Sequence, residues 1–99
     1  MPSIVHTVLL DLDPELPAEA VAAVEALRGL ASLPGVRSMT VGADVSPEGL
    51  GGGFGHAAVA VFDSAEARDA YLTAPEHLAA VDLLQRCLRR VTVVDIEGS

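Results

Sequence analysis

The sequence has few aromatic residues and almost no sulfur. Tryptophan is absent, aromatic side chains make up 3% of the 99 residues, and Cys87 is the single cysteine. A lone cysteine excludes an intrachain disulfide, and no Cys-x-x-Cys pair or metal-ligand spacing of the three histidines supports a zinc site. So few aromatic side chains also argue against haem or flavin binding. We therefore expect no metal, no cofactor, a buried structural thiol and a reducing, cytoplasmic location.

Positive charge is scarce as well. The chain has 6 lysine and arginine residues against 14 aspartate and glutamate residues, a formal net charge of −8 at pH 7. This balance argues against nucleic-acid and anionic-membrane partners. No apolar run approaches the ~20 residues of a membrane span, and the first residues lack the pattern of a signal peptide. The one basic cluster, Arg86, Arg89 and Arg90, is expected at a helix end, where it complements the helix dipole.

Hydrophobic residues are abundant, at 51% of the chain, and most are Ala, Val and Leu. A chain of this length has room for one compact core, so we expect a single domain over residues 1–99. Small aliphatic side chains give that core little apolar surface to bury for a monomer of this size. We therefore expect a partner subunit to bury additional apolar surface.

Hydrophobic periodicity predicts the order β-α-β-β-α-β, with the second helix broken at Pro75. This is the split βαβ, or ferredoxin-like, order of an α+β fold. It predicts a four-stranded antiparallel sheet in spatial order 4-1-3-2 with the helices on one face. Asp63 and Glu66 suggest a capping box at the start of the second helix. The expected strands are 3–12, 36–45, 56–62 and 90–97, and the expected helices are 16–31, 64–72 and 75–89.

Both faces of the predicted sheet are apolar. In the strand 56–62, Ala58 and Ala60 alternate with Val59 and Val61. One chain has enough helix to cover only one face. The other face needs a partner, and the simplest is a second copy packed sheet against sheet as a homodimer.

Taken together, four segments resemble the stress-responsive dimeric α/β-barrel (Dabb) family. They are IVHTVLLDL, LPGVRSMTVGADVSPEGL, GHAAVAVFDSAEARDAYLTAPEH and VVDIE, and they span nearly the whole chain. The resemblance implies a ferredoxin-like homodimer whose two sheets form a barrel, a dimeric α+β barrel. It also implies a cavity in each subunit, between the sheet and the helices.

The segment Tyr-Leu-Thr-Ala-Pro-Glu-His carries the chemistry that the resemblance implies. A characterised plant member of the family closes a linear polyketide by an intramolecular aldol reaction, without metal or cofactor. Its acid–base residues are a tyrosine and a histidine six positions apart, which fall on Tyr71 and His77 here. His6 matches a histidine that lines the pocket of that enzyme.

The residues alone are also consistent with a core tyrosine and a capped, hydrogen-bonded histidine, but they allow an acid–base pair. Residues six apart do not meet on one continuous helix, but the break at Pro75 turns the chain, so that the two side chains can converge on one cavity. His77 lies in the first turn of its helix, where the dipole and burial disfavour the imidazolium form. A neutral His77 is suited to remove a proton beside a carbonyl, while the Tyr71 hydroxyl donates to the developing enolate oxygen.

The expected cavity binds a small apolar substrate or ligand. The first helix has alanines where the plant member has aromatics, and Leu88 takes a tryptophan position, so the lining differs. His6 and Asp95 are expected side by side on adjacent strands. His56 is interpreted as structural, and GLGGGFG as a mobile loop, since no helix or Lys-Ser/Thr follows it. The expected ligand contacts are His6, Val8, Leu10, Ala58, Ala60, Phe62 and Leu88.

Three functions fit these features. The first is a cofactor-free polyketide cyclase or lyase that uses Tyr71 and His77. The second is a non-catalytic, stress-responsive ligand-binding protein. The third is a cofactor-independent monooxygenase, which shares the dimeric barrel architecture.

Overall fold

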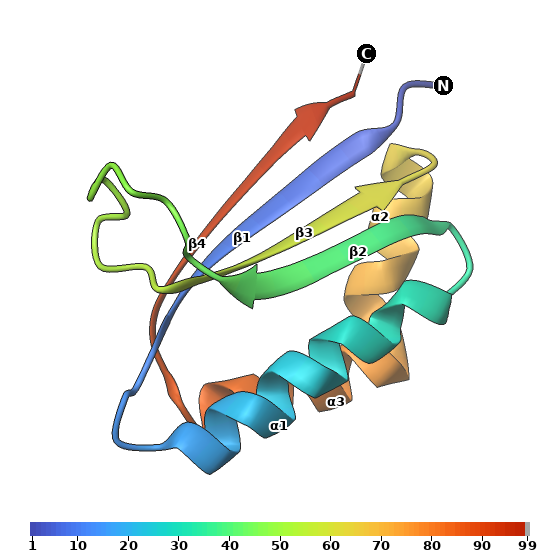
Figure 1. Cartoon of the computed structure of the whole chain (residues 1–99). Helices are drawn as coiled ribbons and strands as arrows, with labels where there is room; N and C mark the ends of the chain where they lie inside the picture. The colour runs from blue at the N-terminus through green and yellow to red at the C-terminus, as the bar shows by residue number, and fades with distance from the viewer. Residues whose placement is uncertain (99) are drawn as a thin grey trace.

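Residues 1–98, which the computed structural model describes, fold into four strands and three α-helices (Figure 1). The last residue of the predicted domain 1–99 lies outside this range. No helix in the described part of the chain is long and apolar enough to cross a membrane. The elements are β1 (Ile4–Leu12), α1 (Pro17–Arg28), a 3₁₀ helix (Gly29–Ser32), β2 (Val36–Ala43), β3 (His56–Phe62), α2 (Ala65–Thr73), α3 (Pro75–Gln85) and β4 (Leu88–Glu97).

The four strands form one antiparallel sheet in the order β2-β3-β1-β4. The three helices lie on one face of this sheet, and α1 packs against α3 (Figure 1). The predicted ferredoxin-like α+β fold, its strand order and its broken second helix are therefore confirmed. In this register His6 on β1 lies between Ala60 on β3 and Asp95 on β4.

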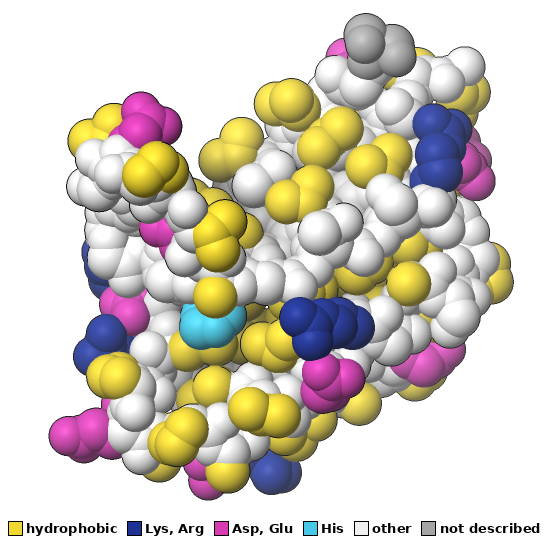
Figure 2. Space-filling view, viewed as in Figure 1, with side chains coloured by type: hydrophobic (Ala, Val, Ile, Leu, Met, Phe, Trp, Pro, Cys, Tyr) yellow, Lys and Arg dark blue, Asp and Glu magenta, His cyan; other side chains and the backbone are white. Residues whose placement is uncertain are grey.

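The core fills the space between the sheet and the helices. Leu10 and Phe62 are its largest fully buried side chains, and smaller aliphatic residues surround them. The opposite face of the sheet has no helix over it. Val94 and Ile96 on that face are 54% and 59% exposed, and Figure 2 shows hydrophobic side chains spread over the sheet surface.

The end of α3 differs from the prediction. The helix was expected to reach residue 89, but it ends at Gln85 and β4 begins at Leu88. Arg89 and Arg90 therefore lie on a strand, not at a helix end. Both donate to the Asp11 carboxylate of β1, Arg89 Nη2 at 2.7 Å and Arg90 Nε at 3.0 Å. Pairing of β4 with β1 and these ion pairs replace the last helical turn.

The start of α2 also differs from the prediction. Ser64, not Asp63, caps the helix, and its Oγ accepts a hydrogen bond from the Ala67 N–H at 3.1 Å. Asp63 instead pairs with Arg37 on β2. Gly35 precedes β2 with a φ of +82°, and a Cβ there would come within 2.8 Å of the Ala67 Cβ. The bare backbone of Gly35 lets α2 approach the sheet closely.

Candidate functional site

A cavity of about 360 Å³ lies beneath the sheet, between its inner face and α2 and α3. This volume is at the lower end of the roughly 300–1,000 Å³ of typical ligand pockets. Most of the wall is aliphatic, and a small polar group occupies one region. The aliphatic lining residues are Val8, Leu27, Met39, Ala58, Ala60, Leu72, Val81, Leu84, Leu88, Val91 and Val93, and the polar ones are His6, Tyr71, His77, Gln85 and Asp95.

The break between α2 and α3 brings Tyr71 and His77 together. Pro75 forces the preceding Ala74 into an extended conformation, with φ −65° and ψ 138°, and then opens α3 as its first residue. The chain turns at this point. The rings of Tyr71 and His77 lie with their centroids 4.5 Å apart at an interplanar angle of 47°.

His77 is held so that one ring nitrogen remains available. Its Nδ1 lies 3.2 Å from the Leu72 carbonyl oxygen, and because a carbonyl only accepts, Nδ1 is the donor and Nε2 carries the lone pair. Burial lowers the pKa of His77 below 6.5. The Leu72 hydrogen bond opposes this shift, and the charge of His6 adds to it. The imidazole is therefore neutral at pH 7, as a general base requires.

Tyr71 is the complementary donor. Its side chain is buried, 4% exposed, between the rings of Phe62 and His77. Within residues 1–98 its hydroxyl has no hydrogen-bond partner, and no buried side-chain nitrogen or oxygen there is left unsatisfied, so the hydroxyl reaches open space. Burial raises the pKa of Tyr71 to about 12. The hydroxyl keeps its proton and donates.

A second polar group adjoins Tyr71. His6 is buried on β1, with its ring 6.2 Å from that of Tyr71, and its Nδ1 lies 2.6 Å from Asp95 Oδ1. Arg68 on α2 donates to Asp95 Oδ2 at 2.8 Å. Burial alone would raise the pKa of Asp95, but the hydrogen bonds from Arg68 and His6 outweigh it, and the net pKa is lowered. The expected neighbourhood of His6 and Asp95 is confirmed.

The structure places most of the predicted ligand contacts on this cavity. His6, Val8, Ala58, Ala60 and Leu88 line it together with Tyr71 and His77. Leu10 and Phe62 do not, because both are fully buried in the layer beneath and support the wall. Their contact with a ligand would need the cavity to open further.

Sequence reasoning missed several participants. Val91 and Val93 line the cavity from β4, and the two-residue alternation that ends at Asp95 was a signal for them. Arg68 was also missed. It precedes Tyr71 by three residues, a spacing that places both side chains on one side of α2. Leu27 and Met39 had no local signal, since tertiary packing alone brings them to this wall.

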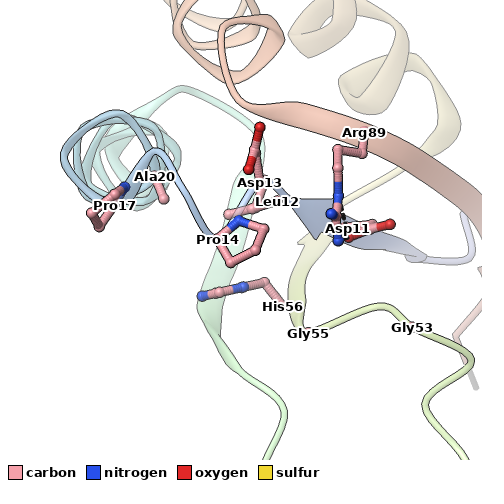
Figure 3. A pocket seen from close by; sticks show the side chains of 10 residues that line it. All are labelled: Asp11, Leu12, Asp13, Pro14, Pro17, Ala20, Gly53, Gly55, His56 and Arg89. Atoms are coloured by element: carbon pink, nitrogen blue, oxygen red, sulfur yellow. Dashed lines mark hydrogen bonds and ion pairs between the residues drawn. The ribbon is translucent and has the colours of Figure 1, made fainter.

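A second hollow of about 430 Å³ lies at the other end of the sheet (Figure 3). Its Asp11 carboxylate is already paired, because it accepts from Arg89 and Arg90, and these bonds hold the pKa of Asp11 below its ordinary value. His56, for which the sequence predicts a structural role, lines this hollow and lies away from the cavity. Within residues 1–98, no three His, Cys, Asp or Glu side chains are grouped as a metal site requires.

Arg90 also fixes the glycine-rich loop between β2 and β3, which stands out as a lobe in Figure 2. Its guanidinium donates to the Gly52 carbonyl at 3.0 Å and stacks 4.6 Å from the ring centre of Phe54. The segment was expected to be a mobile loop, but these contacts tie its end to β4. It leads into the strand β3 and not into a helix, so it lacks the helix N-terminus of a phosphate-binding loop.

The fold and cavity define a ferredoxin-like α+β domain, a class that hosts many functions. Within this class, the chain belongs to the stress-responsive A/B barrel domain (Dabb) family, whose family model matches residues 4–98. No curated protein matches the chain in sequence.

Solved structures agree with this assignment. A dimeric ferredoxin-like protein of unknown function from Jannaschia sp. CCS1 is 26% identical, with 97% of this chain and 99% of that chain covered and a TM-score of 0.85. A similar dimeric protein from Thermobifida fusca YX is 25% identical, with 98% and 92% covered and a TM-score of 0.84. A hydroxynitrile lyase from Passiflora edulis is 18% identical, with 99% and 94% covered and a TM-score of 0.88. At that identity the likeness concerns the fold alone.

Proposed function

We propose that the protein is a cofactor-free cyclase or lyase that acts on a small, mostly apolar carbonyl compound. The observation that carries the proposal is the pairing of His77 and Tyr71 at the polar region of an aliphatic cavity, with ring centroids 4.5 Å apart. The burial that lowers the pKa of His77 and raises that of Tyr71 separates their roles into base and donor.

The proposed reaction begins with proton removal. His77 Nε2 takes a proton from the carbon beside a carbonyl, and the electron pair of that C–H bond moves to form the enolate. The Tyr71 hydroxyl donates to the enolate oxygen as its charge develops. The enolate carbon then attacks a second carbonyl of the same substrate, a C–C bond forms, and the new alkoxide takes the proton from His77.

A finer resemblance supports this chemistry. Olivetolic acid cyclase, a plant enzyme, uses a tyrosine and a histidine at the same interval of six residues. The alanines of α1 and Leu88 take positions that aromatic residues hold in the plant enzyme, so the substrate of that enzyme is not carried over to this protein. A cytoplasmic location, expected from the lone Cys87, is part of the same proposal.

Turnover of a linear aliphatic δ-diketone tests the proposal, because aldol closure gives a hydroxycyclohexanone that loses water to a conjugated cyclohexenone, which is followed by ultraviolet absorbance. His77→Gln should abolish turnover. Tyr71→Phe keeps the ring and should reduce the rate about 10²–10³-fold, by analogy with the loss of an oxyanion-hole donor. His56→Gln removes a histidine outside the cavity and should leave the rate unchanged. Equal loss in all three variants would argue against the assignment.

The rival is a non-catalytic ligand-binding protein with the same cavity. It predicts no turnover in the wild type and altered affinity in both the His77 and Tyr71 variants. Ala60 is 1% exposed on the cavity wall, and Ala60→Phe should fill the space and block binding of small apolar probes. Oxygen uptake during the same assay would instead favour the monooxygenase.

We also infer that the protein is a homodimer joined through the exposed sheet face. Val94 and Ile96 on that face are more than half exposed, and the outward-facing residues of β1 and β3 are aliphatic or threonine. An apolar face of this extent is typical of an interface. The similar proteins from Jannaschia and Thermobifida are described as dimeric.

A further inference from the structure

Arg68, Asp95 and His6 form a hydrogen-bonded chain that links α2, β4 and β1. Arg68 Nη1 donates to Asp95 Oδ2 at 2.8 Å, and the other carboxylate oxygen lies 2.6 Å from His6 Nδ1. Arg68 is further held by Asp69, at 2.9 Å from its Nε. Each member of the chain therefore fixes the next, and the chain ends at the cavity.

The second nitrogen of His6 is the free end of this chain. A carboxylate only accepts hydrogen bonds, so in the neutral ring the proton lies on Nδ1 and Nε2 carries a lone pair. Within residues 1–98, Nε2 has no protein partner, although the His6 side chain is only 8% exposed. No side-chain nitrogen or oxygen in that range is both sealed from solvent and unsatisfied. Nε2 is therefore open to the cavity that His6 lines.

We propose that Arg68 is a positioning residue, which orients Asp95 so that His6, in its neutral form, keeps its proton on Nδ1 and offers Nε2 as an acceptor. The ligand then carries a hydroxyl or enol donor for His6 beside the carbonyl that Tyr71 binds. The ligand part of this inference rests on the proposed function of the same cavity. The tautomer part does not, because it concerns the free protein.

Asp95 alone does not fix this geometry. It lies on β4, an edge strand of the sheet, and its side chain is 25% exposed. With a single partner, the carboxylate would be free to rotate and to exchange its bond to His6 for one to water. Arg68 occupies the second oxygen and removes that freedom, because the guanidinium donates in a fixed planar geometry.

The nitrogen-15 NMR signals of the His6 ring, recorded at alkaline pH where imidazoles are neutral, test the tautomer. The wild type should show the Nδ1–H form alone, and Arg68→Met should show a mixture of both tautomers. Arg68→Lys keeps one charged donor and should retain mostly Nδ1–H. Arg37→Met, which removes an arginine from an exposed pair with Asp63, is the matched control and should resemble the wild type.

A pure Nδ1–H signal in Arg68→Met, or a mixture in the wild type or in Arg37→Met, would overturn the positioning role.

A small alkylphenol and its methyl ether then test the acceptor, since only the phenol donates. The wild type should prefer the phenol, and Arg68→Met should reduce that preference about 2- to 10-fold, the contribution of one neutral hydrogen bond. An unchanged preference in Arg68→Met would overturn the proposal that the ligand donates a hydrogen bond to His6. Absence of diketone turnover would sink the proposed function and leave the tautomer result intact.

Discussion

At the scale of single residues, some hydrogen-bonding groups of the cavity have partners within the protein, and others are free to bind a ligand. Asp95 is engaged at both oxygens, and Nδ1 of each imidazole, His6 and His77, has a protein acceptor. Among His6, Tyr71, His77 and Asp95, the groups without a protein partner are Nε2 of each imidazole and the Tyr71 hydroxyl, whose ring adjoins both imidazoles. When both imidazoles are neutral, a ligand at this group meets one donor flanked by two acceptors, which suits a carbonyl compound that also carries acidic hydrogens.

The lowered pKa of His77 predicts a specific dependence of stability on pH. Above pH 6.5 the ring is neutral in the folded and the unfolded chain, and its contribution to stability is complete. As the pH falls from 6.5 toward the lower folded-state pKa, the unfolded chain binds the proton first, so stability is lost in that window. His77→Gln should remove this loss.

Urea unfolding midpoints of the wild type and His77→Gln across this pH range measure the effect. The difference between the two proteins isolates His77, since every other group titrates in both. Asp11 and Asp95, whose pKa values are lowered from 3.8, titrate below the window. Parallel pH profiles for the two proteins would show that His77 is not held neutral by the fold.

At the scale of secondary-structure elements, α2 carries both Arg68 and Tyr71, and its N-terminus depends on Ser64. The Ser64 Oγ satisfies the Ala67 N–H at 3.1 Å. Ser64→Ala should lower the free energy of unfolding by about 1 kcal/mol, within the range of ~0.5–2 found for lost N-caps. For a domain of this size that corresponds to a melting temperature lower by about 4–8 °C.

Ser32→Ala is the matched control for this prediction. Ser32 lies exposed in the 3₁₀ helix, where its Oγ donates to the Gly29 carbonyl, and it caps no α-helix. Its substitution should change the free energy of unfolding by less than about 0.5 kcal/mol. Thermal unfolding followed by circular dichroism compares the two variants, and equal losses would contradict the capping role of Ser64.

The sequence predicted the fold and part of the site through local signals. Proline and alternating strand patterns are local, and they predicted both the break at Pro75 and the sheet order, which the structure confirms. The boundary between α3 and β4 depends on contacts between residues far apart in the sequence, because ion pairs to Asp11 on β1 hold Arg89 and Arg90 in the strand. The spacing from Tyr71 places Arg68 on the same side of α2, but its partner, Asp95, is 27 residues away, and only the fold brings the two together.

At the scale of the whole molecule, the sheet has two different faces. One is covered by the three helices and encloses the cavity, and the other is an uncovered apolar surface (Figures 1 and 2). Similar proteins from Jannaschia and Thermobifida are described as dimeric, and a second copy of the same apolar face is the partner that we propose for this surface. Because Asp95 and Val94 alternate on β4, one strand serves both the cavity and the proposed interface.

Val59→Asp tests the proposed dimer directly. Val59 pairs with Thr7 on β1 and Thr40 on β2, at the middle of the uncovered face, so an aspartate there would place an unpaired charge in the interface of both subunits. Sedimentation at micromolar concentration should show a dimer for the wild type and a monomer or an unfolded chain for the variant. Val21→Asp, at a 62% exposed position on α1, introduces the same charge on the helical side and should remain dimeric. A wild-type monomer, or a Val59→Asp dimer, would place the partner elsewhere or remove it.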